Sequence, residues 1–213
     1  MLGRWRWCGV AAPALFTAVW ATLGAAVPGY SPLRHWVSSL SLAPGAGRVQ
    51  VAAFLLTGVL LLLFAVGLGR STPTGPGSTW GPRWIAVVGA GLVAAGLFPI
   101  GPALGYPPGG SEAGSTAPLH DLAGLAVFVG LTAAPAVWGR RWQRAWSLGS
   151  ATAVIGFWVA GGVLAGLDYA GVWTPAPAGL AERVSITAGM LWLLTVAMAE
   201  GPSPERTAQP AGP

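Results

Sequence analysis

The chain has 213 residues, of which 54% are hydrophobic and only 8% are charged. Soluble domains carry roughly 25% charged residues, so this composition excludes a water-soluble fold and indicates a membrane protein. The formal net charge of +5 comes from arginines that stand between apolar runs, which argues against a nucleic-acid partner, and the single cysteine, Cys8, excludes a disulfide framework.

Six apolar runs follow one another along the chain, each long enough to cross the hydrocarbon core of a bilayer, which is about 30 Å thick. They occupy residues 8–27, 49–68, 84–104, 119–138, 147–167 and 182–199. The first run also resembles a signal peptide, but its length and the even number of spans favour a retained helix. The sequence thus predicts one all-α, polytopic membrane bundle of six transmembrane helices over residues 1–199. The Pro-rich residues 200–213 are expected to form a disordered cytoplasmic tail.

Residues 31–42, between the first two runs, predict a short amphipathic helix. Ser31 can cap it and Pro32 suits its first position. Its apolar residues recur at helical spacing: Leu33, Trp36, Val37 and Leu40. We expect this helix to lie at the membrane surface or to fold back into the mouth of the bundle.

Small residues mark two places where helices can approach closely. Gly91 and Ala95 form a small-xxx-small pair in the third run, and Gly162 and Gly166 repeat the spacing in the fifth.

Six spans place both termini on one side, where eight of the eleven arginines stand: Arg4, Arg6, Arg70, Arg83, Arg140, Arg141, Arg144 and Arg206. Positive charge favours the inner side, so we expect cytoplasmic termini in a bacterial cytoplasmic membrane. Most other polar groups then face outward, and the candidate substrate-binding residues are among them: Arg34, His35, Ser38, Tyr169, Glu182 and Arg183.

His120 and Asp121 open the fourth run and are candidate catalytic residues together with Asp168. One interpretation is structural: Asp121 lies in the first helical turn and compensates the helix dipole, and His120 is interfacial. The other makes His120 a general base or metal ligand that is oriented by a carboxylate such as Asp168.

Other groups of polar residues give weaker indications of a metal site, a catalytic triad or a substrate-binding pair. No cofactor is predicted, although His35, His120 and a carboxylate would supply ligands for a divalent metal. Ser38 lacks the turn sequence of a nucleophile elbow, so it is expected to be structural rather than part of a triad with His120 and Asp168. Glu182 and Arg183 are expected to form an interfacial ion pair or a dipole-compensating first turn rather than a substrate clamp.

Three segments together resemble an uncharacterised bacterial six-span family, the domain of unknown function nine-nine-eight. They are Tyr30-Ser31-Pro32-Leu33-Arg34-His35 leading to Ser38, Phe98-Pro99, and His120-Asp121-Leu122-Ala123-Gly124. The resemblance covers residues 13–199 and implies the six-span topology but no activity. The family often has an acidic residue after the Phe-Pro pair, near where this chain has Gly101.

Three functions fit these features. The first is a membrane enzyme that acts on a lipid or isoprenoid at the outer leaflet, with His120 and a carboxylate transferring protons and Arg34 or Arg183 holding an anionic group. The second is a non-catalytic lipid-binding or accessory subunit, and the third, a transporter, ranks last because the span centres lack charge. Membrane lipids and a hydrophobic or isoprenoid ligand, bound near Trp20, Trp158 or Trp192, are the expected partners. The oligomeric state is left open.

Overall fold

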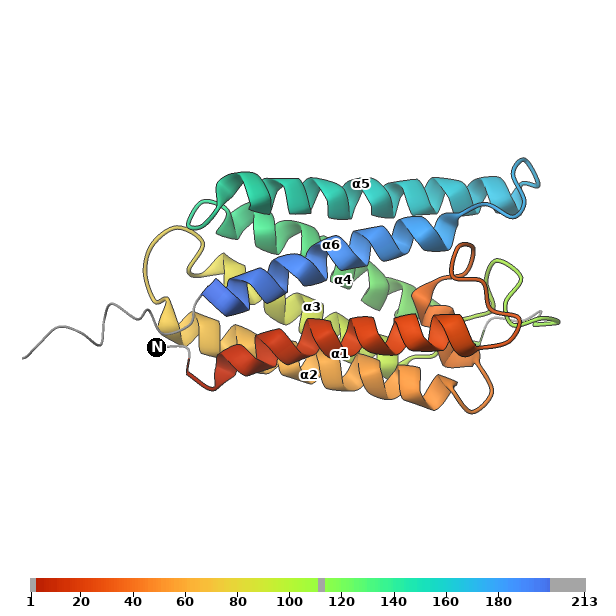
Figure 1. Ribbon diagram of the computed structural model, residues 1–213, viewed down its shortest axis with the longest axis horizontal. Helices are drawn as coiled ribbons and strands as arrows, with labels where there is room; N and C mark the ends of the chain where they lie inside the picture. The colour runs from red at the N-terminus through yellow and green to blue at the C-terminus, as the bar shows by residue number, and fades with distance from the viewer. Residues whose placement is uncertain (1–2, 111–113, 200–213) are drawn as a thin grey trace, which may run out of the picture.

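A computed structural model describes residues 3–110 and 114–199, which form six long α-helices and one short 3-10 helix (Figure 1). The long helices are α1 (Trp5–Ala26), α2 (Gly47–Ser71), α3 (Trp80–Leu97), α4 (Ala117–Trp138), α5 (Arg144–Tyr169) and α6 (Ala178–Ala199). All six are long and apolar enough to span a membrane. The predicted all-α, six-span bundle is therefore confirmed, whereas Glu112, Arg206 and the expected tail lie outside the described residues.

The helix boundaries differ from the predicted spans at the points where local backbone rules act. α3 ends at Leu97 rather than near residue 104, because Phe98 precedes proline and adopts an extended conformation. α4 and α6 begin earlier than predicted, so Asp121 and Glu182 are each the fifth residue of their helix and neither helix has an acidic residue in its first turn. The prediction that these carboxylates compensate a helix dipole in the first turn is therefore wrong.

The helices run roughly along the long axis of the molecule, and both α1 and α6 have their chain-terminal ends at the same end of the bundle (Figure 1). α2 packs between α1 and α3, α3 packs against α4, and α6 packs against both α5 and α1. The α3–α4 contact is close, because a Cβ atom at Gly91 would lie 2.9 Å from the backbone oxygen of Ala123. The small-xxx-small pair of α3 is thus a helix-packing site, as predicted.

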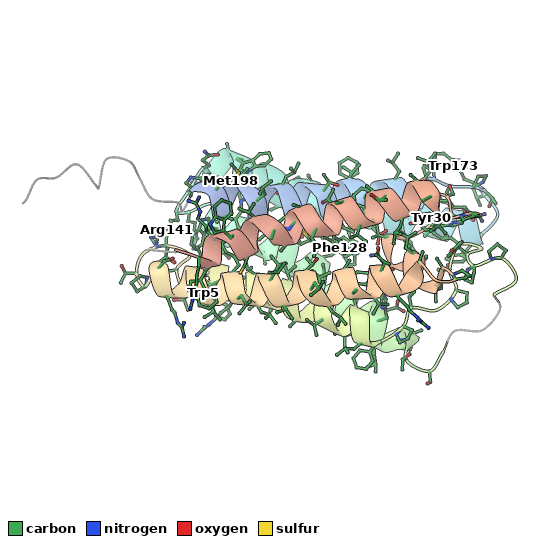
Figure 2. The ribbon with its side chains drawn as sticks, turned by 60° about the horizontal axis from the view of Figure 1, so that its bottom comes forward. Trp5, Tyr30, Phe128, Arg141, Trp173 and Met198 are labelled. Carbon is green, nitrogen blue, oxygen red and sulfur yellow. The ribbon has the colours of Figure 1, made fainter. Side chains whose placement is uncertain are left out.

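The end of the bundle that holds the chain termini, here called the terminal end, is lined with arginines that lie over tryptophan rings. The guanidinium-to-ring distances are 5.3 Å for Arg4–Trp5, 4.5 Å for Arg6–Trp7, 5.1 Å for Arg83–Trp80 and 5.6 Å for Arg141–Trp138. In Figure 2, Trp5, Arg141 and Met198 mark this end, while Tyr30 and Trp173 mark the opposite one, here called the site end. Paired tryptophan and arginine residues are typical of the membrane–water boundary.

At the site end, the segment between α1 and α2 folds into the mouth of the bundle. Its helix, η1 (Val37–Leu42), is a 3-10 helix that contacts α1, α2 and α6. The predicted α-helix from Ser31 along the membrane surface is therefore wrong, and the alternative of folding back into the mouth is confirmed. A side-chain bond explains the difference: the N–H of Ser31 donates to His35 Nδ1 at 2.9 Å, which fixes a turn where the helix was expected to begin.

Candidate functional site

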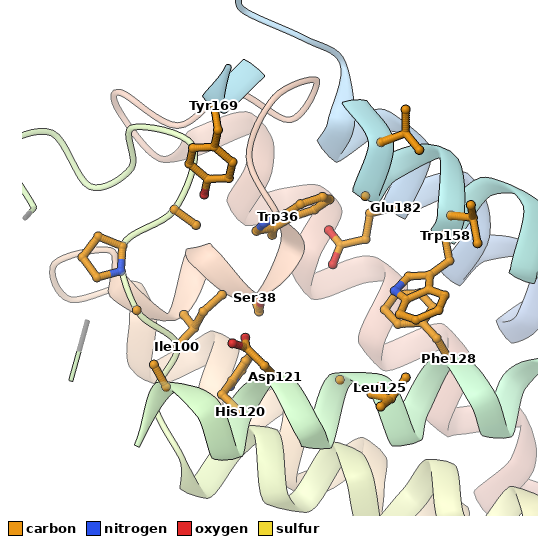
Figure 3. Close-up of a pocket in the computed structure, with 18 residues that line it drawn as sticks. Trp36, Ser38, Ile100, His120, Asp121, Leu125, Phe128, Trp158, Tyr169 and Glu182 are labelled. Carbon is orange, nitrogen blue, oxygen red and sulfur yellow. The ribbon is translucent and has the colours of Figure 1, made fainter. Parts of the chain in front are cut away.

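A cavity of about 790 Å³ lies at the site end, between α4 and α5, with η1 and α6 forming its inner wall (Figure 3). This volume is within the range of ligand-binding pockets, roughly 300–1,000 Å³. Five of the nine candidate site residues line it: Ser38, His120, Asp121, Tyr169 and Glu182. The other four, Arg34, His35, Asp168 and Arg183, do not.

Part of the cavity lies where α4 and α5 face each other through glycine residues. Gly124 of α4 and Gly162 of α5 both line it, and a Cβ atom at either position would have no other atom within 4 Å. The spacing of Gly162 and Gly166 therefore leaves a gap in this chain instead of a close helix contact. The wall also includes Leu125, Val159 and Val163, which are 42%, 52% and 58% exposed. The cavity therefore has an apolar, exposed rim on the side of two helices that are able to span a membrane.

Glu182 extends from α6 into the cavity, where it is only 8% exposed (Figure 3). Its Oε2 accepts a hydrogen bond of 2.6 Å from the backbone N–H of Val37, at the start of η1. Its Oε1 takes part in none of the hydrogen bonds between described residues. One carboxylate oxygen thus holds the short helix in place, and the other is available to a ligand.

His120 lines the same cavity from α4 and is 5% exposed. Its Nδ1 lies 2.8 Å from the carbonyl oxygen of Phe98 and 3.1 Å from that of Ala95, at the end of α3. Because carbonyl oxygens only accept, Nδ1 carries the proton, and in the neutral ring Nε2 has the free lone pair. The ring is thereby oriented by α3 rather than by a carboxylate.

Three exposed or partly exposed groups complete the polar part of the cavity. Asp121 directs its carboxylate from α4 into the space that Glu182 enters from α6 (Figure 3). Ser38 contributes a hydroxyl from η1. The hydroxyl oxygen of Tyr169 accepts the N–H of Leu104 at 3.0 Å, so its own hydrogen is left to donate.

Asp168 is occupied elsewhere, in a bidentate ion pair with Arg34. Arg34 donates from Nε to Oδ2 at 3.0 Å and from Nη2 to Oδ1 at 2.6 Å, and the N–H of Ala176 donates to Oδ2 at 2.8 Å. These bonds tie the α1–η1 segment to the α5–α6 loop. Asp168 therefore does not orient His120, and Arg34 is not presented to the cavity.

Arg183 is enclosed by acceptors at the base of the same segment. Its Nη1 donates to the carbonyl oxygens of Pro32, His35 and Gly179 at 2.6, 2.9 and 2.8 Å, and its Nη2 donates to the hydroxyl of Tyr30. The only ion pair among the described residues is Arg34–Asp168, so the predicted Glu182–Arg183 ion pair is wrong. Successive helix residues point about 100° apart, which sends Glu182 to the cavity and Arg183 away from it.

Tyr30 and His35 form an aromatic cluster with Tyr106 beside this arginine. The ring centroids are 5.2 to 5.4 Å apart. Burial raises the pKa of Tyr30, so its hydroxyl stays protonated and donates to the carbonyl oxygen of Trp36 at 2.9 Å. No group of three His, Cys, Asp or Glu side chains in the described ranges is placed to hold a metal, which leaves His35 and His120 in separate sites.

We predict that the stability of the fold decreases as the pH falls below about 6.5, the ordinary pKa of histidine. Burial, and then the charge of Arg34, lower the pKa of His35. Below about pH 6.5 the unfolded chain binds a proton at His35 that the folded chain does not, so stability is lost from there down to the lowered pKa. Thermal unfolding between pH 8 and pH 5 should show this slope in the parent chain and a shallower one in His35→Asn. Equal slopes would assign the pH dependence to other groups.

Several cavity residues were not identified from the sequence. Trp36, Leu125 and Phe128 line the cavity, and Phe128 stacks on Trp158 with centroids 5.5 Å apart. Of the three tryptophans expected near a ligand, only Trp158 lines it, because Trp192 is buried in the core and Trp20 lies beside Arg183. For Phe128 and Trp158 the sequence did hold a signal, since each lies four residues from a glycine of its own helix, Gly124 or Gly162.

One comparison with known proteins identifies a family, and it adds no activity. The model of the family described as "Protein of unknown function (DUF998)" matches residues 10–199. No curated protein and no solved structure matches the chain. The matched residues include most of α1 and all of α2 to α6, with every residue of the cavity. The chain therefore belongs to the DUF998 family, as a member with six helices able to span a membrane.

Proposed function

We propose that this protein binds a single lipid or isoprenoid molecule in the cavity between α4 and α5 and transfers protons on its polar end. The observation that supports this is the division of the cavity into an apolar part open to the side and a polar end with three titratable groups. The hydrocarbon chain would lie along Leu125, Val159 and Val163. The reacting group would then meet His120 and the two carboxylates.

The geometry gives these groups different roles. His120 has its Nδ1–H held by α3, so Nε2 is the atom that would accept a proton from a bound molecule. Glu182 and Asp121 would bind the polar end and receive or return a proton. Proton transfer by a positioned side chain typically accelerates a reaction by a factor of about 10² to 10⁴, so these groups are sufficient for an enzyme with a modest rate acceleration.

A non-catalytic lipid-binding protein is the second candidate. It is favoured by the bonds of His120 to two carbonyl oxygens at the end of α3 and of Glu182 to η1, because both residues also hold the structure together. A transporter is less well supported. Behind His120 lies a second cavity of about 50 Å³, which is too small for a path and is lined mainly by apolar residues such as Phe16, Leu92 and Met190.

We place the site at the outer leaflet of a bacterial cytoplasmic membrane. Seven of the described arginines lie at the terminal end, which therefore suits the cytoplasmic side. A cysteine introduced at the open Gly109 position, in a chain with Cys8→Ser, is expected to react with a membrane-impermeant thiol reagent in intact cells. Labelling only after the cells are broken would reverse this orientation.

Filling the cavity should remove the ligand without disturbing the fold. We predict that Gly162→Phe lowers the occupancy of a copurifying lipid at least about tenfold, because the ring would occupy the space between α4 and α5. Gly156→Phe is the matched control: Gly156 is an exposed residue of the same helix, with no atom within 4 Å of an added Cβ, but it does not line the cavity. Native mass spectrometry of the purified variants measures the occupancy. Equal lipid retention in both would show that the cavity is not the binding site.

A further inference from the structure

The cavity contains two carboxylates and no arginine. This imbalance is unexpected for a lipid site, because most membrane lipids carry a phosphate and the sequence suggested Arg34 or Arg183 as its partner. Whether those arginines are available decides which head group the cavity accepts.

Both candidate arginines already have their partners within the chain. Arg34 is bound by Asp168 through two hydrogen bonds. Arg183 donates to three carbonyl oxygens and a tyrosine hydroxyl and is 6% exposed. Arg48, the remaining arginine of the site end, is an exposed residue of α2 that does not line the cavity. No cationic lysine or arginine side chain among the described residues faces the ligand space.

The two acidic residues and the histidine that line the cavity contribute hydrogen-bond acceptors. Glu182 is more than nine-tenths buried, and its Oε1 has no hydrogen-bond partner among described residues. His120 is equally buried, and Nε2 of its neutral ring is also an acceptor. The remaining donors are neutral hydroxyl and indole groups, from Ser38, Tyr169, Trp36 and Trp158. A phosphate, which is an anion and accepts hydrogen bonds, would lie beside two carboxylates without a counter-charge.

We infer that the cavity selects an amphiphile whose head group donates hydrogen bonds and bears no net negative charge, with a primary amine as the best match. This inference rests on the proposed function, since it names the substrate class of that same cavity. An ammonium group supplies three donors to Glu182, Asp121 and His120. The two carboxylates also neutralise the positive charge of the ammonium group, whereas they would repel the negative charge of a phosphate.

Two photoreactive probes test this directly. They share a dodecyl chain with a diazirine and differ only in the head group, a primary amine or a phosphate. The purified full-length chain is labelled in uncharged detergent micelles at pH 8, and label in peptides of α4 and α5 is counted by mass spectrometry. Label that persists in Gly162→Phe is subtracted as non-specific.

We expect the amine probe to label the cavity about tenfold more than the phosphate probe. Asp121→Asn, which removes a charge at an exposed position, should reduce this preference, and Glu182→Gln should reduce it further. Equal or stronger labelling by the phosphate probe, still blocked by Gly162→Phe, overturns the inference and leaves the proposed site intact. If neither probe distinguishes the parent chain from Gly162→Phe, the proposed function itself fails.

Discussion

Replacing Arg183 with methionine is expected to destabilise the fold by at least about 3 kcal/mol. In a buried region, the substitution would remove the guanidinium donors of the carbonyl oxygen of Pro32 and of the hydroxyl of Tyr30. It would leave the carbonyl oxygen of His35 with the longer bond from the Tyr30 hydroxyl, at 3.3 Å. Each unsatisfied buried group costs about 1–3 kcal/mol. The loss should release the whole segment between α1 and η1, because all three of these acceptors belong to it.

The control for this prediction is Arg48→Met, the same chemical change at an exposed position of the site end. Surface substitutions usually change stability by less than about 0.5 kcal/mol. Unfolding of both variants in a mild detergent, followed by tryptophan fluorescence, compares them. Arg183→Lys should lie between the parent and Arg183→Met, since lysine keeps the charge but cannot reach separate acceptors with a planar fork. Similar stability of the two methionine variants would show that the acceptors of Arg183 form hydrogen bonds with water when the arginine is removed.

Replacing His120 with asparagine is expected to lower any turnover at least about 100-fold, the lower range of the contribution of general acid–base catalysis. Asparagine can still donate a hydrogen bond to the carbonyl oxygen of Phe98, so the tie between α3 and α4 is kept. It has no group that takes up a proton near neutral pH. The variant therefore separates the chemical role of the ring from its structural role.

Turnover can be measured before the substrate is known. A total lipid extract is incubated with the purified protein, and mass spectrometry follows the ions that appear and disappear. His35→Asn serves as the control histidine, because His35 does not line the cavity. An unchanged rate in His120→Asn would mean that Asp121 or Glu182, rather than His120, transfers the proton. No conversion by the parent chain, with a lipid still bound, would favour the non-catalytic function.

The six spans could be predicted from hydropathy because membrane helices satisfy their own backbone and need only an apolar run of sufficient length. Their ends were harder to predict. The shorter α3 follows from Phe98-Pro99, a local rule that the sequence displays. The docking of η1 does not, because the backbone N–H of Val37 donates to Glu182, which is 145 residues away.

Five of the polar residues that line the cavity could be named from the sequence, but how the polar residues of this end pair with one another could not. His120 and Asp121 were chosen for their rarity in an apolar chain, and both line the cavity. Asp168 was grouped with His120 because the predicted topology places both at the same end of the bundle. The sequence does not show that the carboxylate of Asp168 pairs with Arg34, which is 134 residues away. Several polar groups at one end of a bundle could pair with one another. Which pairs form depends on how the helices pack, and the sequence alone does not show this.

The gap between α4 and α5 has a further consequence, for how tightly a ligand must bind. Under the proposed function, a molecule that enters past Leu125 and Val159 would come from the bilayer and would not cross water. Its supply is set by its mole fraction among the surrounding lipids, which for a common membrane component is far above any aqueous concentration it reaches. A weak preference for one head group is then enough to keep the cavity occupied. Binding measured in mole per cent, rather than in molar units, is the meaningful scale for this protein.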